Sequence, residues 1–276
     1  MKRVLVLFPN DWDKVEFAKA KYQKEFTFIF AGPELFSFPG YLKLPFFSIQ
    51  GFISKMLKKI KREKIDAVLS SDEYIGAILA AVLAQKATLP GTDPSLIILA
   101  QHKYYSRLVQ QEHCPEASVN CELIPRQLLK SHQPKLPFPF FVKPVKGTFS
   151  LFANKVNNLS DLQAHMNFNF FERQVLKFIT RPFNQLIENY SDLNENANHF
   201  IAEELIEGLQ VTVDGFVSNG KVTLCGVVDS IMFEGTNIFE RFQYPSRIRQ
   251  DVQSRMMDIV EQLITGIDFK NAQFNV

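Results

Sequence analysis

Residues 139–150 combine side chains that an ordinary strand does not combine. Phe140 to Val142 form a short apolar strand, and Lys143 follows where burial of an ammonium group is costly unless an anion pairs with it. Pro144 favours an extended Lys143. A second ammonium group, a glycine that permits close backbone approach and a hydroxyl follow: Lys146, Gly147 and Ser150. The stretch predicts a phosphate-type anion site; an edge strand with a solvated lysine is the alternative.

A second stretch, at 200–216, places three carboxylates in an otherwise strand-like run. These are Glu203, Glu204 and Glu207. After a glycine, the run continues with the strict alternation of apolar and polar residues that is typical of a half-buried strand. A solvated face explains one carboxylate more easily than three. The sequence contains neither the GxxxxGK[ST] phosphate loop nor the GxGxxG dinucleotide fingerprint.

The two stretches, in this order and at this separation, resemble the core of the ATP-grasp family, the fold of carboxylate–amine and carboxylate–thiol ligases. The resemblance implies that Lys143 contacts the phosphates of a nucleotide. It also implies an adenine-binding hinge, in which a carboxylate takes the amino group and the backbone makes the remaining bonds. The implied hinge residues are Glu203, Glu204, Leu205 and Ile206.

The ribose position departs from the family pattern. Members usually carry a second glutamate where this chain has Gln210. Because an amide still forms hydrogen bonds with a hydroxyl, the resemblance implies a weaker contact to ribose rather than none. Glu207 is the alternative residue for this role.

A lysine earlier in the chain completes the phosphate site that the resemblance implies. Residues 90–95 and the helical segment after them, which carries Lys103, are similar to the family's junction between amino-terminal domain and ligase core. Family members commonly have Asp-Lys where this chain has His102 and Lys103. The resemblance implies that Lys103 and Lys143 converge on one triphosphate. Taken alone, Lys103 reads as a surface lysine.

The order of the expected elements indicates an α/β fold class. A βαβ opening predicts a Rossmann-like amino-terminal domain, and the resemblance identifies it with the domain that precedes an ATP-grasp core of two subdomains. We expect this first domain at 1–95 and an ATP-grasp subdomain with the phosphate-binding hairpin at 96–199. A second subdomain, incomplete at its carboxyl end, is expected at 200–276.

Local signals predict several element boundaries. Ser70 to Glu73 has the S-x-x-E spacing of a capping box at the start of a helix. Ser160 is expected to cap another helix. Residues 170–190 are expected to be helical but broken near Pro182. The asparagine–glycine pair at 219–220 predicts a hairpin turn between two strands.

Composition limits the classes of function. The 276 residues are 46% hydrophobic, which suffices for a sizeable core, and the formal net charge of +2 is too mild to indicate nucleic acid or an anionic membrane as the main partner. A basic helix expected at 49–64 favours nucleic acid, but a solvated outer face explains it better. No apolar run has the length of a membrane span or of a signal peptide core. Three cysteines without a CxxC pattern argue against a disulfide framework or zinc site, and we expect a cytoplasmic protein.

Phenylalanine is the most unusual feature of the composition, with 27 residues against a single tryptophan. Most are expected in the core. Several lie in expected loops and leave an apolar substrate pocket or interface open: Phe36, Phe38, Phe46 and Phe47. The sequence does not decide between a monomer and a homodimer.

The carboxyl end carries an expectation about metal. The resemblance implies that a magnesium-binding glutamate follows the strand at 269–276 and that a further strand completes the metal site. We therefore expect the Mg²⁺ ligands beyond Val276 and none within the sequence. A second departure is Ser230, which stands where many relatives have a basic residue for the γ-phosphate.

The function implied by the resemblance is an ATP-dependent ligase. ATP would activate a small carboxylate substrate as an acyl phosphate, which an amine or thiol acceptor would then attack. The alternative is a nucleotide-binding or scaffolding protein that has kept the fold without the metal site. The residues themselves, without the resemblance, indicate an anion site in an α/β chain.

Overall fold

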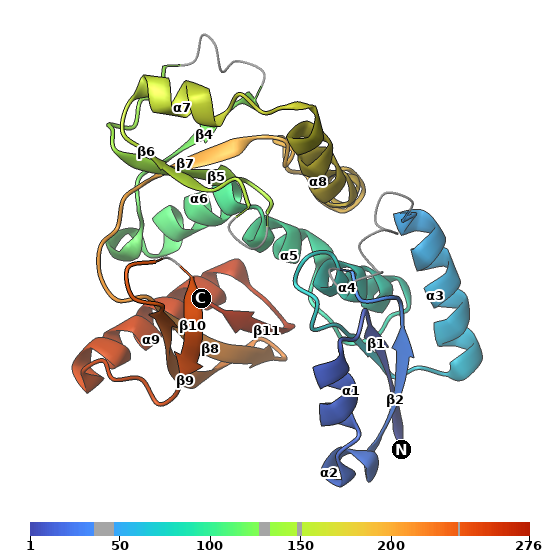
Figure 1. Cartoon of the computed structure of the whole chain (residues 1–276). Coiled ribbons are helices and arrows are strands. Elements are labelled where there is room, and N and C mark those ends of the chain that lie inside the picture. Colours follow the sequence, from blue (N-terminus) through green and yellow to red (C-terminus); the bar gives the residue numbers. More distant parts are fainter. Residues whose placement is uncertain (36–46, 127–132, 148–150, 237) are drawn as a thin grey trace.

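The computed structural model describes residues 1–35, 47–126, 133–147, 151–236 and 238–276, and in these residues the chain forms three β-sheets. The first sheet is parallel, and the other two are antiparallel. In Figure 1 the first sheet lies at the lower right, the second at the upper left and the third at the lower left. The mixed α/β class that the sequence predicts is confirmed.

The first sheet has the order β2-β1-β3. Its strands are β1 (Lys2–Leu7), β2 (Phe26–Ala31) and β3 (Ala67–Leu69). The helices of this region are α1 (Asp11–Phe17), α2 (Ala20–Gln23), α3 (Ile49–Glu63) and α4 (Gly76–Lys86). β1 is buried from Val4 to Leu7, as expected of a central parallel strand covered on both faces. The basic helix α3 packs an apolar stripe, which includes Ile53, Met56 and Ile60, into the same core.

Two consecutive helices lead from the first sheet towards the others: α5 (Pro94–Gln101) and α6 (Lys103–His113). His102 between them is completely buried and has extended backbone angles, so the segment that carries Lys103 is two helices. Its Nδ1 accepts a hydrogen bond from the Tyr105 backbone N–H at 3.5 Å. Burial lowers the pKa of His102 to about 4, so the ring stays neutral and caps α6 as an aspartate would.

The second sheet has the order β4-β7-β5-β6. Its strands are β4 (Cys121–Ile124), β5 (Phe140–Pro144), β6 (Asn154–Val156) and β7 (Phe200–Glu204). A short 3₁₀ turn, η2 (Pro115–Ala117), precedes β4, and the helices are α7 (Leu159–His165) and α8 (Phe170–Tyr190). β5 and β6 form the hairpin expected after the lysine-bearing strand.

Three local predictions for these helices are wrong. α8 is unbroken at Pro182. Phe183 and residues of the next helical turn are buried, and this burial outweighs the loss of the backbone hydrogen bond that the proline removes. α7 is capped by Asn158, whose side chain accepts from Asp161 N, and not by Ser160. α4 begins at Gly76 and has no capping box. The carboxylate of Asp72 accepts from the first free N–H groups instead, at Ile75 and Gly76.

The third sheet has the order β10-β9-β8-β11. Its strands are β8 (Val211–Ser218), β9 (Lys221–Met232), β10 (Phe239–Gln243) and β11 (Asn271–Asn275), and α9 (Gln250–Ile267) packs on one face. The predicted hairpin is confirmed: Asn219 and Gly220 both have positive φ, at 50° and 80°, between β8 and β9. In the described part of the chain, no helix is both long and apolar enough to cross a membrane.

Candidate functional site

Lys143 and Glu203 lie on neighbouring strands of the second sheet. β5 and β7 are antiparallel, with Phe141 opposite Glu203 and Lys143 opposite Ile201. Lys143 and Glu203 are therefore diagonal neighbours on the same face. Their side chains form an ion pair, with Nζ 2.6 Å from Oε2. The sequence placed both residues in one site, and the structure brings them together.

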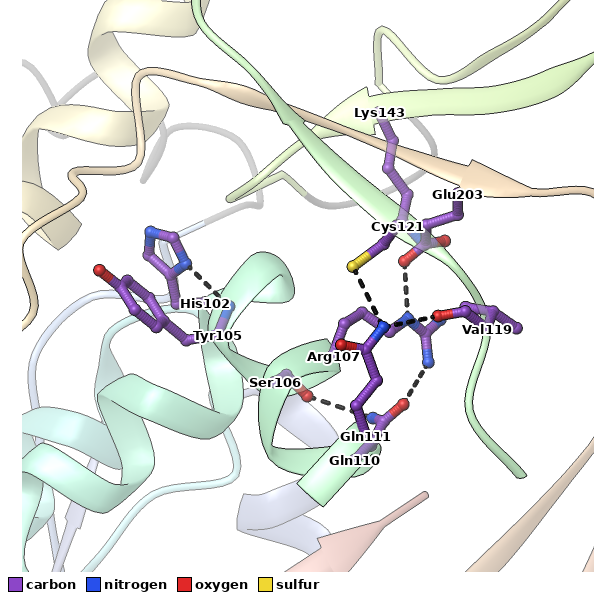
Figure 2. Close-up of polar contacts among 10 residues, drawn as sticks. All are labelled: His102, Tyr105, Ser106, Arg107, Gln110, Gln111, Val119, Cys121, Lys143 and Glu203. Atoms are coloured by element: carbon purple, nitrogen blue, oxygen red, sulfur yellow. Dashed lines mark hydrogen bonds and ion pairs between the residues drawn. The ribbon is translucent and has the colours of Figure 1, made fainter. Parts of the chain in front are cut away.

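Arg107 is a third member of this group, and we missed it in the sequence. It lies on α6, one turn after Lys103, and its Nε donates to Oε1 of Glu203 at 2.7 Å (Figure 2). Its Nη1 donates to Gln110 Oε1 at 2.5 Å, and Gln110 in turn donates to Ser106 Oγ at 3.3 Å. The one available signal was its helical spacing from Lys103, which places both side chains on one face of α6.

Glu203 is an ionised carboxylate enclosed by cations. Its side chain is only 8% exposed, and each of its two oxygens has a cationic partner. Burial by itself raises the pKa of Glu203, but the hydrogen bond from Arg107 and the charge of Lys143 outweigh it, so the pKa lies below its usual range. The carboxylate thus keeps its negative charge at neutral pH.

Lys103 lies beside the same group. Its Nζ donates to the backbone oxygen of Gly147 at 3.0 Å. Burial, and then the positive charge of Lys143, lower the pKa of Lys103 to about 8. Arg107 and Lys143 thus contact the carboxylate of Glu203, and Lys103 lies near enough for the charges of Lys143 and Glu203 to act on it.

Lys146 has a different environment from Lys143, although both were predicted to face phosphate. It is 5% exposed, and its Nζ donates to Gln101 Oε1 on α5 at 2.7 Å. Its ammonium also lies over the rings of Phe183, 4.7 Å away, and Tyr74, 5.5 Å away. Burial, and then the charge of Lys103, lower the pKa of Lys146 to about 7. To bind phosphate, this ammonium would have to leave Gln101.

The structure says less about the other residues that were predicted to face phosphate. A Cβ at Gly147 would meet Pro144 at an ordinary contact distance of 3.5 Å, so no neighbour among the described residues requires a glycine there. The carbonyl of Gly147 is the acceptor for Lys103. Ser150 lies outside the described residues, as do Phe36, Phe38 and Phe46.

The two hinge glutamates are separated by strand geometry. Because side chains alternate along β7, Glu204 points to the opposite face from Glu203. Glu204 Oε2 accepts from Asn120 Nδ2 at 2.7 Å. An open pocket of about 690 Å³ beside β4 is lined by Glu204 together with Tyr104, Asn120 and Lys135. The two carboxylates therefore lie in different environments on opposite faces of the sheet.

The linker from the second sheet to the third carries the other predicted hinge and ribose residues. Leu205 is half-buried, whereas Ile206, Glu207 and Gln210 are exposed. The backbone oxygen of Gln210 accepts from Ser230 N at 2.9 Å, which ties the linker to β9. Free side chains and backbone groups in this linker are thus accessible to a ligand.

The third sheet gives little support for a metal centre. Across the described ranges, no three or more His, Cys, Asp or Glu side chains are grouped so that they could hold a metal ion. Ser230 is buried on β9, and its hydroxyl has no partner in the described structure. The neighbouring Asp229 accepts from Arg247 Nε at 3.1 Å.

Comparison with protein families decides the family of the chain. The model of the ATP-grasp domain matches residues 136–276, slightly more than half of the chain. The chain belongs to the ATP-grasp family. The match begins just before β5 and extends through the third sheet, so it contains Lys143 and Glu203 but neither Lys103 nor Arg107.

Solved structures of ATP-grasp proteins share the fold. An L-amino acid ligase from Bacillus licheniformis superposes with a TM-score of 0.70 at 15% identity, over 99% of this chain and 62% of its own. The VanG D-Ala:D-Ser ligase from Enterococcus faecalis gives a TM-score of 0.61 at 14% identity, over 99% of this chain and 85% of its own. A biotin carboxylase domain from Hydrogenobacter thermophilus, in complex with MgADP, gives 0.60 at 13% identity, over 99% and 60%.

These likenesses establish the fold of the chain and not its reaction. The chain spans 62% of the length of the L-amino acid ligase and 85% of that of the VanG ligase. Comparison with curated protein sequences gives no match.

Proposed function

We propose that the chain carries the nucleotide site of an ATP-dependent ligase, which activates a carboxylate as an acyl phosphate for attack by an amine or thiol. One observation carries this proposal: Arg107 and Lys143 both pair with the carboxylate of Glu203, and the ammonium of Lys103 lies near them. A triphosphate supplies the negative charge that this group lacks. The family supports the proposal, since its structural neighbours include amino acid and D-Ala:D-Ser ligases.

The proposed roles follow from position. Lys143 and Lys103 bind the phosphates, with Lys146, Gly147 and Ser150 as further members of the loop. Glu203 and the backbone from Glu204 to Ile206 hold the adenine, and Gln210 or Glu207 contacts the ribose. This assignment agrees with the accessibility of the 205–210 linker.

The proposed reaction has two steps. An oxygen of the substrate carboxylate attacks the γ-phosphorus, the bond to the bridging oxygen breaks, and ADP leaves. The amine or thiol then attacks the acyl carbon, and inorganic phosphate leaves with the bonding electron pair. Lysine charges fixed around the phosphates lower the barrier of the first step, because they are already in place when negative charge builds on the leaving group.

Magnesium neutralises phosphate charge in such reactions when it is bound, and a neighbour of this fold holds MgADP. The described residues contain no group of three or more His, Cys, Asp or Glu side chains that could hold it.

A nucleotide-binding protein without ligase chemistry is the second candidate. Ser230 favours it, because this buried serine stands where many relatives carry a basic residue for the γ-phosphate. A neutral hydroxyl stabilises a transferring phosphoryl group less than a cation does.

One experiment separates the candidates. ATP binding is measured by calorimetry, and phosphate release is then measured over a panel of carboxylates paired with amines and thiols. The ligase requires ATP binding and phosphate release that depends on both substrates. ATP binding without release under any pair indicates the second candidate, and the absence of ATP binding contradicts both.

A further inference from the structure

Both oxygens of Glu203 are occupied in this structure. Oε1 accepts from Arg107 Nε at 2.7 Å, and Oε2 lies 2.6 Å from Lys143 Nζ. A carboxylate that is only 8% exposed requires such partners, because leaving it unpaired in a buried place is strongly unfavourable. Two cations thus share this carboxylate, one on each oxygen.

Lys143 cannot pair fully with Glu203 and with a nucleotide phosphate at the same time. Its ammonium has three donors but a single charge, and each phosphate oxygen that it binds weakens its attraction for Glu203. If Lys143 were the only partner, its departure would leave a buried, unpaired carboxylate beside the incoming phosphates. That carboxylate would both repel the nucleotide and pull the lysine back.

Arg107 is built to stay with Glu203. Its guanidinium is anchored at a second point, since Nη1 donates to Gln110 Oε1 at 2.5 Å, and both residues belong to α6 (Figure 2). Its side chain is 26% exposed, so it is held mostly within the protein. The planar fork of an arginine binds two acceptors at once, whereas a lysine swings on a flexible stem. The arginine is thus the fixed partner and Lys143 the exchangeable one.

We propose that Arg107 is a positioning residue of the nucleotide site: it holds Glu203 in place and charged while Lys143 exchanges that carboxylate for a nucleotide phosphate. The inference rests on the proposed function and deepens it. It assigns to a helix residue outside the matched family region the task of freeing the phosphate-binding lysine.

The test is a double-mutant cycle on ATP binding, measured by calorimetry. Arg107→Met should weaken ATP binding at least about tenfold, because Lys143 becomes the only counterion of Glu203. Glu203→Gln should weaken ATP binding in the unaltered chain, where Glu203 is a ligand of adenine. In the Arg107→Met background, the same change should strengthen it, because the carboxylate that retains Lys143 is gone. A purely structural arginine does not reverse the sign.

Two further variants control the cycle. Arg107→Lys keeps the positive charge but loses the fork that holds Glu203 and Gln110 together, so it should weaken ATP binding by only about threefold, less than Arg107→Met. This variant also covers the case that Arg107→Met does not fold. Arg62→Met, which removes an exposed arginine paired with Glu63 on α3, should leave ATP binding unchanged. Urea unfolding of each variant checks that it is folded.

The outcomes are distinct. ATP binding that is unchanged in Arg107→Met, or a Glu203→Gln effect of the same sign and size in both backgrounds, overturns the role of Arg107 and leaves the proposed function standing. Should Arg107→Met not fold, ATP binding by Arg107→Lys as weak as by Glu203→Gln overturns it. Absence of ATP binding by the unaltered chain overturns the proposed function and, with it, this inference.

Discussion

Lys143 and Lys146 belong to one short segment and have opposite surroundings. Lys143, inside β5, meets a carboxylate 2.6 Å away, whereas Lys146, beyond the strand end, meets an amide oxygen and two aromatic rings. In the described part of the chain, no salt bridge involves Lys146. The difference shows that the position of a lysine in residues 139–150 does not by itself determine which groups the lysine contacts. A cation that is paired with a carboxylate can exchange its partner, whereas an unpaired, buried cation is costly to keep charged.

The largest expected effect separates the two lysines directly. Lys143→Ala should weaken ATP binding by about a hundredfold, because it removes a charge-assisted phosphate contact. Lys146→Met should weaken it less, since Lys146 is already engaged with Gln101. Calorimetry measures both. Lys155→Ala, an exposed lysine on the adjacent strand β6, is the control. Equal losses for Lys143 and Lys146 would erase the distinction.

A second effect concerns stability and pH. An unfolded lysine titrates near 10.5, and Lys146 in the folded chain near 7, so the unfolded state binds more protons between these values. The free energy of unfolding should therefore rise with pH from about 7 upwards. Lys146→Met should increase it at pH 6 by on the order of a few kcal/mol and remove much of the rise. Urea unfolding at pH 6, 7.5 and 9 measures this.

Lys221→Met, at an exposed position on β9, should leave the pH dependence of stability as it is in the unaltered chain. A Lys146→Met curve that runs parallel to that of the unaltered chain would contradict the idea that burial makes the charged form of Lys146 unfavourable.

A third effect tests Lys103. Its pKa of about 8 means that a large part of it is neutral at pH 8.5, and bound phosphate favours the charged form. ATP binding at this pH should take up protons, and ATP affinity should fall as the pH rises above about 8. Calorimetry in buffers of different ionisation enthalpy measures the uptake. Lys103→Arg stays charged and should bind ATP with less proton uptake; identical uptake would count against Lys103.

The smallest expected effect concerns the linker between the second and third sheets. Gln210→Glu should tighten ATP binding about threefold, since a carboxylate accepts a ribose hydroxyl more strongly than an amide does. Glu207→Gln is the matched change at the rival position, and both side chains are exposed. If Glu207→Gln weakens binding while Gln210→Glu changes nothing, Glu207 contacts the ribose.

Sequence patterns predicted much of the fold because they report local structure. Apolar runs and alternation located the strands around Lys143 and Glu203, and the asparagine–glycine pair located the β8–β9 turn. Patterns failed where packing overrode a local preference. Pro182 does not break α8, because buried side chains on both sides of it hold the helix, and Asp72 rather than Glu73 satisfies the start of α4.

The site was predicted only in part. Lys143 and Glu203 could be placed in one site because the two stretches that carry them resemble the core of the family. Arg107 could not be found, because its contact with Glu203 joins residues 96 positions apart, and it depends on how α6 is rotated against β7. Helical spacing shows which residues share a face but not what the face meets.

The sequence by itself determined the α/β class, the family resemblance and the presence of two lysines without a carboxylate in residues 139–150. Only the tertiary structure decided how the charges pair: Lys143 and Arg107 with Glu203, and Lys146 with Gln101. The physical reason is that strand and helix periodicities act over a few residues, whereas an ion pair requires two atoms within about 4 Å, and that distance is set by the packing of whole elements.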